Sequence, residues 1–218
     1  MQIANVTRAS RGLLYLVITE EYCAGRSALD VAEAAIAGGV DIIQMREKTK
    51  TAKELIALGK KMAGLCKKKG VIFIVNDDPL LAREIDADGA HLGQEDLKGF
   101  SAWQARRVLG PDKIIGVSTH SVEQFSAANE MDFDYIAFGP VFETKTKDYF
   151  IGTGGIEYVL KAAKKPVFFI GGINLFNINR VLDKGARNIA LIRGIAEAED
   201  IISRTKEFKG RIAAKNDK

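Results

Sequence analysis

Cysteine is scarce in this sequence, and the two that occur are not spaced as metal ligands. Cys23 and Cys66 are the only cysteines in 218 residues, and they fall in different expected segments. Cysteine-based zinc sites and disulfide frameworks need several cysteines at short spacings, so neither is expected here. Reduced thiols are the default for such a chain, and we therefore expect a cytoplasmic protein.

Long hydrophobic runs are also missing. No apolar stretch approaches the roughly 20 residues that a membrane-spanning helix needs. The first residues lack the apolar core of about 7–15 residues and the cleavage site that mark a signal peptide. We expect no membrane association and no signal peptide.

An excess of one charge is absent too. The 32 Lys and Arg residues nearly balance the 28 Asp and Glu residues, which gives a net charge of +4. The basic run at residues 67–69 ends an expected helix, where cations suit the helix dipole. This mild basicity gives no reason to expect a nucleic-acid partner.

No linker or low-complexity segment divides the chain, and 47% of its residues are hydrophobic. A chain of this length and composition can bury one large core. We expect a single domain over residues 1–218, with a short N-terminal extension (about 1–12) and a polar C-terminal tail (about 213–218).

What the sequence does contain is a repeated alternation of short β-branched runs with longer amphipathic stretches. Eight runs read as strands, at residues 13–19, 41–45, 71–75, 89–92, 114–117, 135–138, 167–170 and 188–192. Helices are expected between them, at residues 28–37, 52–69, 79–85, 101–109, 122–130, 155–163, 176–184 and 198–208. Strands that are almost wholly apolar are typical of a parallel sheet covered on both faces.

Eight such units in 218 residues predict a single (β/α)₈ TIM barrel, a fold that usually spans about 250 residues. The rival is a doubly wound sheet, which usually has a glycine-rich turn after its first strand. Here the first strand leads into Glu20-Glu21-Tyr22, and polar motifs instead follow nearly every strand. In a barrel all these motifs would meet at one face, where catalysis takes place.

The early strands end in acidic and basic side chains. Asp77 and Asp96 each follow a short apolar run, and two such carboxylates are costly unless a cation lies between them. The simplest cation is Mg²⁺, which prefers oxygen ligands and leaves room for phosphate oxygens. Arg46 and Lys48 end another run, and together with Gln44 they can project to the same side. These features indicate a metal–diphosphate site.

The late strands end in features suited to a second anion. A long loop over residues 139–155 carries two hydroxyls, two cations and a glycine-rich turn that opens a helix. Gly171-Gly172 and Ile192-Arg193-Gly194 end the last two strands, where barrels commonly hold a phosphate. We therefore expect a monophosphate site there.

Each motif also has a plain structural explanation. Asp78 before Pro79 suits a helix cap, so we assign capping to Asp78 and metal binding to Asp77. Arg46 and Lys48 could form a surface salt-bridge cluster with Glu47. Gly171-Gly172 could be only a tight turn. His120 and especially His91 suit structural roles near strand ends.

Taken together, the motifs resemble those of the thiamine phosphate synthase (thiamine-phosphate pyrophosphorylase) family, over residues 14–202. The resemblance rests on residues 44–48, 76–78, 88–96, 116–120, 139–142 and 171–173, with Thr144, Thr146 and Lys147. It implies Mg²⁺ at Asp77 and Asp96. It implies that hydroxymethylpyrimidine diphosphate is held by Gln44, Arg46, Lys48, Asn76, Ser118 and Lys147, with Arg46, Lys48 and Lys147 as the catalytic cations. It implies that thiazole phosphate is held by Thr144, Thr146, Gly172, Ile192 and Arg193.

The implied reaction is dissociative. Diphosphate leaves the pyrimidine methylene, the electron-rich ring stabilises the cation, and the thiazole nitrogen captures it. Such chemistry needs neutralised charge and aligned reactants rather than a nucleophilic side chain.

Two departures from the family pattern keep alternatives open. The family usually has proline at Glu143 and often serine at Arg193. Glu143 and His120 are similar to features of a sister family of thiazole tautomerases, which use a histidine and no metal pair. A barrel that binds a thiamine intermediate without catalysis and a generic sugar-phosphate enzyme are further alternatives. The sequence leaves the oligomeric state open, a homodimer included.

Overall fold

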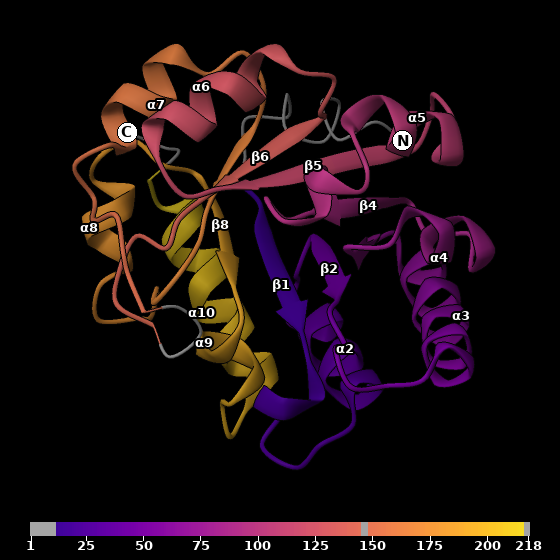
Figure 1. Cartoon of the computed structure of the whole chain (residues 1–218). Helices are drawn as coiled ribbons and strands as arrows, with labels where there is room; N and C mark the ends of the chain where they lie inside the picture. Colours follow the sequence, from indigo (N-terminus) through magenta and orange to yellow (C-terminus); the bar gives the residue numbers. More distant parts are fainter. Residues whose placement is uncertain (1–11, 145–147, 216–218) are drawn as a thin grey trace.

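A closed barrel of eight parallel strands forms the centre of the molecule in the computed structural model, which describes residues 12–144 and 148–215 (Figure 1). The strands are β1 (Leu14–Ile18), β2 (Ile42–Met45), β3 (Ile72–Asn76), β4 (Gly89–Leu92), β5 (Ile114–Thr119), β6 (Tyr135–Phe138), β7 (Val167–Phe169) and β8 (Asn188–Leu191). Each strand pairs with the next in chain order, and β8 pairs with β1, which closes the ring. The predicted TIM barrel is confirmed, and the doubly wound sheet is rejected.

Helices surround this barrel, as Figure 1 shows. They are α2 (Ala28–Ala37), α3 (Ala52–Lys69), α4 (Pro79–Glu84), α5 (Ala102–Leu109), α6 (Val122–Glu130), α7 (Ile156–Ala162), α8 (Ile178–Leu182), α9 (Arg193–Ala196) and α10 (Ile201–Ala213). Two single-turn 3₁₀ helices, η1 (Glu20–Tyr22) and η2 (Asp96–Lys98), follow β1 and β4.

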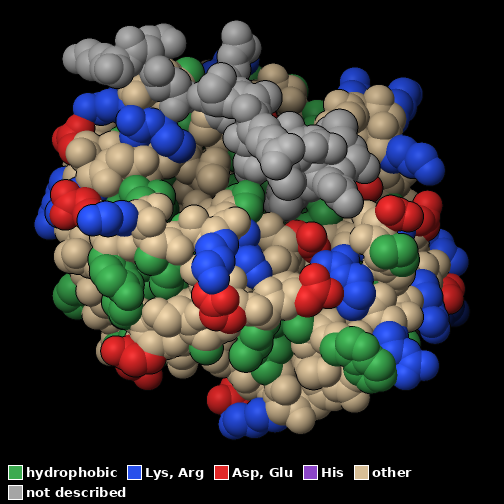
Figure 2. Space-filling view, turned by 90° about the horizontal axis from the view of Figure 1, so that it is seen from above, with side chains coloured by type: hydrophobic (Ala, Val, Ile, Leu, Met, Phe, Trp, Pro, Cys, Tyr) green, Lys and Arg blue, Asp and Glu red, His purple; other side chains and the backbone are tan. Residues whose placement is uncertain are grey.

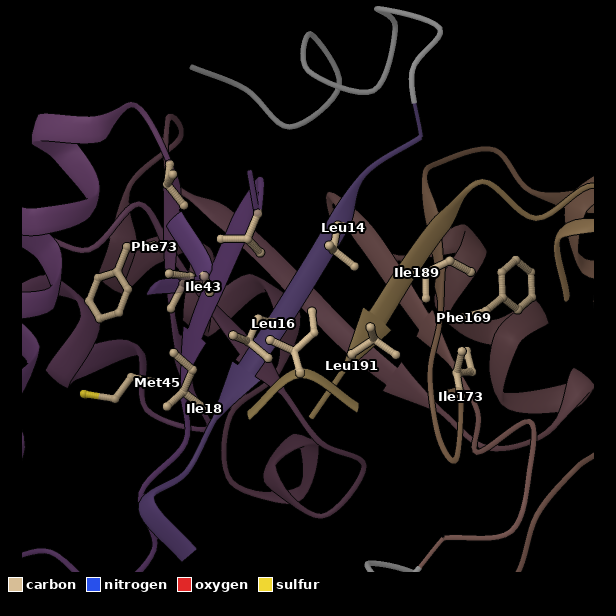
Figure 3. Close-up of a cluster of buried hydrophobic side chains, with 14 of the residues drawn as sticks. Leu14, Leu16, Ile18, Ile43, Met45, Phe73, Phe169, Ile173, Ile189 and Leu191 are labelled. Atoms are coloured by element: carbon tan, nitrogen blue, oxygen red, sulfur yellow. The ribbon is translucent and has the colours of Figure 1, made fainter. Parts of the chain in front are cut away.

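The strands bury both of their faces, in two separate clusters. On β1, Leu14, Leu16 and Ile18 belong to the layer between strands and helices (Figure 3), whereas Tyr15 and Val17 lie in the barrel lumen. Successive strand residues point to opposite faces, so alternate residues feed alternate clusters. This explains why the strands are apolar almost throughout, and it places every second residue of each strand in the lumen.

Capping side chains fix where several helices begin. Ser27 accepts a hydrogen bond from the Asp30 N–H, and Thr51 forms a capping box with Glu54 at the start of α3. Such a cap contributes about 1 kcal/mol by satisfying an otherwise orphaned N–H group. The bounds of α2, α3 and α6 are those that the sequence predicts.

Three short helices were not predicted. The elements η1, η2 and α9 have only three or four residues each, too few to show a helical hydrophobic period. The last helix also differs, since α10 begins at Ile201 rather than at residue 198. Its start is set by Asp200, whose side chain accepts the Ser203 N–H at 2.9 Å.

The surface carries charges of both signs. Across the face seen in Figure 2, basic and acidic side chains are interspersed, and neither gathers into a single patch. None of the helices in the described parts of the chain is long and apolar enough to cross a membrane. The expected extension and tail fall largely outside the described residues and stay predictions.

Candidate active site

A cavity of about 720 Å³ opens at the carboxyl ends of the strands. Eight of the residues predicted to bind substrate line it: Gln44, Arg46, Asn76, Ser118, Thr144, Gly172, Ile192 and Arg193. They come from six of the eight strands or the loops that follow them. Residues far apart in sequence are thus brought to one mouth, as the barrel prediction requires. Thr146 and Lys147, which were also predicted to bind, lie outside the described residues.

Two carboxylates meet beside this cavity. Asp77 directly follows β3, and its N–H donates to the carbonyl oxygen of His91 on β4 at 2.8 Å. Asp96 opens η2, and its Oδ2 accepts the Gly93 N–H at 2.7 Å. A Cβ at Gly93 would lie 2.9 Å from the same oxygen, so glycine permits this close approach.

Burial raises the pKa of Asp77 to about 6, and the neighbouring Asp96 adds to the rise through a hydrogen bond and through its charge. Lys48 and Arg46 act in the opposite direction and lower this pKa. Two carboxyl groups this close cannot both carry their charge cheaply, so either a proton or a cation has to lie between them. Asp77 also has a φ of 66°, a left-handed conformation that few non-glycine residues adopt.

The cations that follow β2, Arg46 and Lys48, have no hydrogen-bond or salt-bridge partner for their side chains among the described residues. Glu47, the expected partner in a surface cluster, instead accepts the Glu20 N–H at 2.7 Å. Burial raises the pKa of Glu47. The salt-bridge explanation is therefore wrong, and an anion-binding role for Arg46 and Lys48 is favoured.

Asp78 has the capping role that was assigned to it. Its Oδ1 accepts the Leu81 N–H at 2.9 Å, and Pro79 occupies the first turn of α4. Asp77 instead interacts with Asp96, and its assignment to metal binding stays a prediction.

A chain of hydrogen bonds crosses the lumen beneath the cavity, and sequence reasoning missed it. Gln44 Nε2 donates to the Tyr15 hydroxyl at 2.6 Å, and the Tyr15 and Tyr135 hydroxyl oxygens are 2.9 Å apart. The Tyr135 hydroxyl lies 2.9 Å from His91 Nδ1, and His91 Nε2 lies 2.8 Å from Ser118 Oγ. We call these five residues the lumen chain.

The lumen chain is deeply buried. Burial lowers the pKa of His91 to about 4, so its ring is neutral, and burial raises the pKa of Tyr15 and of Tyr135. Gly116 makes the room, because a Cβ there would lie 2.4 Å from the Tyr135 hydroxyl oxygen. One feature of the sequence could have revealed the lumen chain. In both β1 and β6 a tyrosine occupies a lumen position of an otherwise apolar strand.

The late loops are shaped by glycine backbone. Gly171 and Gly172 have φ values of 99° and 64°, and a Cβ at Gly172 would lie 2.3 Å from the Glu143 carbonyl oxygen. The loop after β6 packs on this turn, where the Phe142 N–H donates to the Gly171 carbonyl oxygen at 3.0 Å. The tight-turn explanation is thus correct, and the same turn also lines the cavity.

Arg193 differs from the early cations, because it already has partners. Its Nε donates to Glu197 Oε1 at 2.6 Å, and its guanidinium carbon lies 5.4 Å from the centre of the Tyr22 ring. Both Arg193 and Glu197 line the cavity.

His120 also lines the cavity, from the end of β5. Its Nδ1 lies 2.6 Å from the Gly139 carbonyl oxygen, and its ring packs edge-on against Tyr149 with centroids 5.9 Å apart. Through these contacts His120 connects the loops after β5 and β6, which is a structural role.

Comparison with known proteins gives one consistent picture. A family model described as "Thiamine monophosphate synthase" matches residues 14–195. The chain is 42% identical to the thiamine-phosphate synthase of Halalkalibacterium halodurans over 191 residues, covering 86% of this chain and 89% of that protein. It is 41% identical to that of Pelotomaculum thermopropionicum over 207 residues, covering 94% of both. Among solved structures it resembles a thiamine phosphate pyrophosphorylase from Pyrococcus furiosus, with a TM-score of 0.84, 32% identity, and coverage of 94% of this chain and 96% of that one.

Proposed function

The chain belongs to the thiamine monophosphate synthase family and is a transferase, and from this premise we propose that it joins hydroxymethylpyrimidine diphosphate to thiazole phosphate. The products are thiamine phosphate and diphosphate. The observation that carries the proposal is the mouth itself, where an acidic pair and two unpaired cations lie beside a cavity.

The residues present fit a divalent cation. Asp77 and Asp96 already share a space that needs positive charge, as the raised pKa of Asp77 indicates. Among the described residues no group of three or more acidic, histidine or cysteine side chains could hold a metal ion, so that part of the chain offers two carboxylates here. Mg²⁺ commonly binds through one or two carboxylates plus substrate phosphates and water. Bound there, the ion would neutralise charge on the departing diphosphate.

Arg46 and Lys48 would hold the diphosphate oxygens. Arg46 offers a planar fork and Lys48 a compact charge, and both keep their donors available for a ligand. These fixed cations favour the leaving diphosphate more than the intact substrate, because charge accumulates on it as the bond breaks. In our proposal Lys147 joins them from the loop after β6.

The pyrimidine ring would occupy the cavity between Gln44 and Ser118, with Asn76 at the end of β3. Neither cysteine can serve as a nucleophile at this mouth, because both lie in the layer between strands and helices. Burial raises the pKa of Cys23 to about 11 and of Cys66 to about 12. This supports a dissociative step in which the ring itself stabilises the methylene cation.

Thiazole phosphate would bind at the late loops. Thr144, Gly172, Ile192 and Arg193 line that side of the cavity, and Thr146 is proposed to join them. Placing the thiazole nitrogen opposite the methylene carbon is what converts two reactants into one aligned pair.

The test is product formation from both substrates, with Mg²⁺ and with EDTA. Asp77→Ala and Asp96→Ala should each lower turnover by roughly 10²–10⁴-fold, since several kcal/mol of charge stabilisation are lost. Asp112→Ala, at an exposed turn, is the matched control and should leave turnover unchanged.

The tautomerase alternative predicts the opposite order. Its activity would be independent of metal, and His120→Ala would cost roughly 10²–10⁴-fold, as removal of a general acid–base group does. No coupling by the wild-type protein in the presence of Mg²⁺ would overturn the synthase proposal.

A further inference from the structure

The loop after β1, residues 19–27, lies against α9, although none of its residues lines the substrate cavity. We call this segment the β1 loop. In Figure 1 the indigo β1 loop and the yellow segment around α9 lie side by side. The reaction proposed above uses no residue of this loop.

Arg26 anchors the β1 loop to the end of α9. Its Nη1 donates to the Ala198 carbonyl oxygen at 2.8 Å, and its Nη2 donates to the Ala196 carbonyl oxygen at 2.8 Å. Its Nε donates within the loop, to the Cys23 carbonyl oxygen at 3.0 Å. One guanidinium group therefore joins segments about 170 residues apart in the sequence, and the β1 loop and α9 hold each other in place.

Tyr22 of the same loop packs against the side chain of Arg193. The guanidinium carbon of Arg193 lies over the Tyr22 ring, 5.4 Å from its centre, where the face of an aromatic ring attracts a cation. Glu197 holds another part of the same group, since Arg193 Nε donates to Glu197 Oε1 at 2.6 Å. One face of the guanidinium and its Nε are thus both occupied.

The end of the Arg193 guanidinium that carries Nη1 and Nη2 is left for a ligand. Among the described residues neither nitrogen has a hydrogen-bond partner, and Arg193 lines the cavity. Two parallel N–H groups match two oxygens of a phosphate group. An arginine that is already held in place loses less side-chain freedom when it binds such a group, and this preorganisation raises affinity.

We propose that Tyr22 is a positioning residue that holds Arg193 ready for the phosphate group of the second reactant. The inference rests on the proposed function, because that reactant is thiazole phosphate. Tyr22 does not line the cavity, so it acts through Arg193 rather than by touching the ligand.

Tyr22 also lies within electrostatic range of Arg46, the cation that is proposed to hold diphosphate. Burial raises the pKa of Tyr22 and Glu21 adds to the rise, while Arg193 and Arg46 both act by charge in the opposite direction. The ring packs on Arg193, however, and no described ring contact or hydrogen bond joins it to Arg46. A change at Tyr22 should therefore affect thiazole phosphate and not the pyrimidine diphosphate.

The variants either remove or keep the aromatic face of Tyr22. Tyr22→Leu keeps an apolar side chain without that face, whereas Tyr22→Phe keeps the face. Tyr158→Leu, at an exposed position of α7, is the matched control. Arg193→Ala, alone and combined with Tyr22→Leu, completes a double-mutant cycle that shows whether Tyr22 acts through Arg193.

Calorimetry measures the affinity for thiazole phosphate and for the same thiazole without its phosphate. Tyr22→Leu should weaken binding of thiazole phosphate by roughly 3- to 10-fold and leave the unphosphorylated compound unchanged. Tyr22→Phe should stay within about twofold of wild type, and Tyr158→Leu should match it. In the Arg193→Ala background Tyr22→Leu should have no further effect. The affinity for hydroxymethylpyrimidine diphosphate, measured with Mg²⁺, should be the same in Tyr22→Leu and wild type.

Four results would each overturn the inference: no wild-type preference for the phosphorylated thiazole, unchanged affinity in Tyr22→Leu, an equal loss in Tyr22→Phe, or a further loss in the Arg193→Ala background. A purely structural role would weaken both thiazole compounds alike, and a role toward Arg46 would weaken the pyrimidine diphosphate, so either outcome also contradicts it. Because binding is measured apart from turnover, a wild-type protein that shows the expected binding differences but forms no product would overturn only the proposed function.

Discussion

The barrel mouth has an early half, after β2, β3 and β4, and a late half, after β6, β7 and β8, and the two halves differ in the features that suit anion binding. After β2, β3 and β4, the early mouth has an acidic pair and two cations that form no salt bridge with one another within the described structure. Asp77 is pressed against Asp96, while Arg46 and Lys48 have no salt-bridge partner there. This arrangement fits the diphosphate and the metal ion that we propose for the early mouth, neither of which the described residues supply.

The late mouth, after β6, β7 and β8, relies on backbone shape. Gly171 and Gly172 turn where a side chain would collide, and Arg193, a cation among the described residues of this end, is already paired with Glu197. The difference indicates that electrostatic strain is concentrated where diphosphate would leave, and shape complementarity where the second reactant would be held. Each of the following predictions tests this difference.

Among the variants that compare the two halves, the largest effect is expected from Arg46→Ala. Loss of one preorganised donor to the developing charge should lower kcat/KM for the pyrimidine diphosphate by roughly 10²–10³-fold. The unfolding free energy should not fall, because no described partner is left unpaired. Steady-state kinetics and denaturant unfolding provide the two measurements.

The comparison variant is Arg193→Ala. Its charge is already shared with Glu197, so a loss of only about tenfold is expected, in the KM for thiazole phosphate. Equal losses from the two arginine variants would remove the distinction between the halves.

A medium effect is expected from Gly172→Ala, on stability. Its φ of 64° disfavours alanine, and the added Cβ would lie 2.3 Å from the Glu143 carbonyl oxygen. We expect a loss of about 2–4 kcal/mol, from the unfavourable φ and the forced shift of the loop after β6. Gly152→Ala is the matched control, since its φ is 72° and no atom lies within 4 Å of the added Cβ. It should cost about 1 kcal/mol, and a similar cost for both would show that the turn is not close-packed.

The contrast between the halves also explains what sequence reasoning could reach. Start signals such as Thr51 with Glu54 are local, so α3 was predicted with its observed bounds. The meeting of Asp77 and Asp96 followed from strand order alone, because consecutive parallel strands are neighbours.

Other features depended on elements too short to predict. The pairing of Arg193 with Glu197 is an i,i+4 contact, and it becomes visible only once the four-residue α9 is known. The lumen chain joins five strands, and no local pattern shows which lumen residues meet across a barrel. The expected roles of Thr146 and Lys147, the cytoplasmic location and the homodimer stay predictions.

The smallest effect is expected from Asp77→Asn, on the pH dependence of stability in metal-free protein. This variant tests whether the acidic pair Asp77 and Asp96 of the early mouth is under strain. A carboxyl group whose pKa is raised on folding, here from about 4 to about 6, binds its proton more tightly in the folded state. Its contribution to stability is therefore full below about pH 4 and is lost as the pH rises to about 6.

The asparagine variant lacks this loss, so its stability relative to wild type should increase between pH 4 and pH 6 and then level off. Denaturant unfolding in EDTA at several pH values measures the difference, with Asp112→Asn, at an exposed turn, as the control that should show no such trend. Adding Mg²⁺ at pH 7 should stabilise wild type and not Asp77→Asn, because a cation that binds only the folded protein adds its binding free energy to folding. Parallel pH curves for wild type and Asp77→Asn, with no separate response to Mg²⁺, would show that the early mouth is no more strained than the late one. The contrast between charged side chains at the early mouth and backbone shape at the late mouth would then have to be abandoned, since the acidic pair is its strongest support.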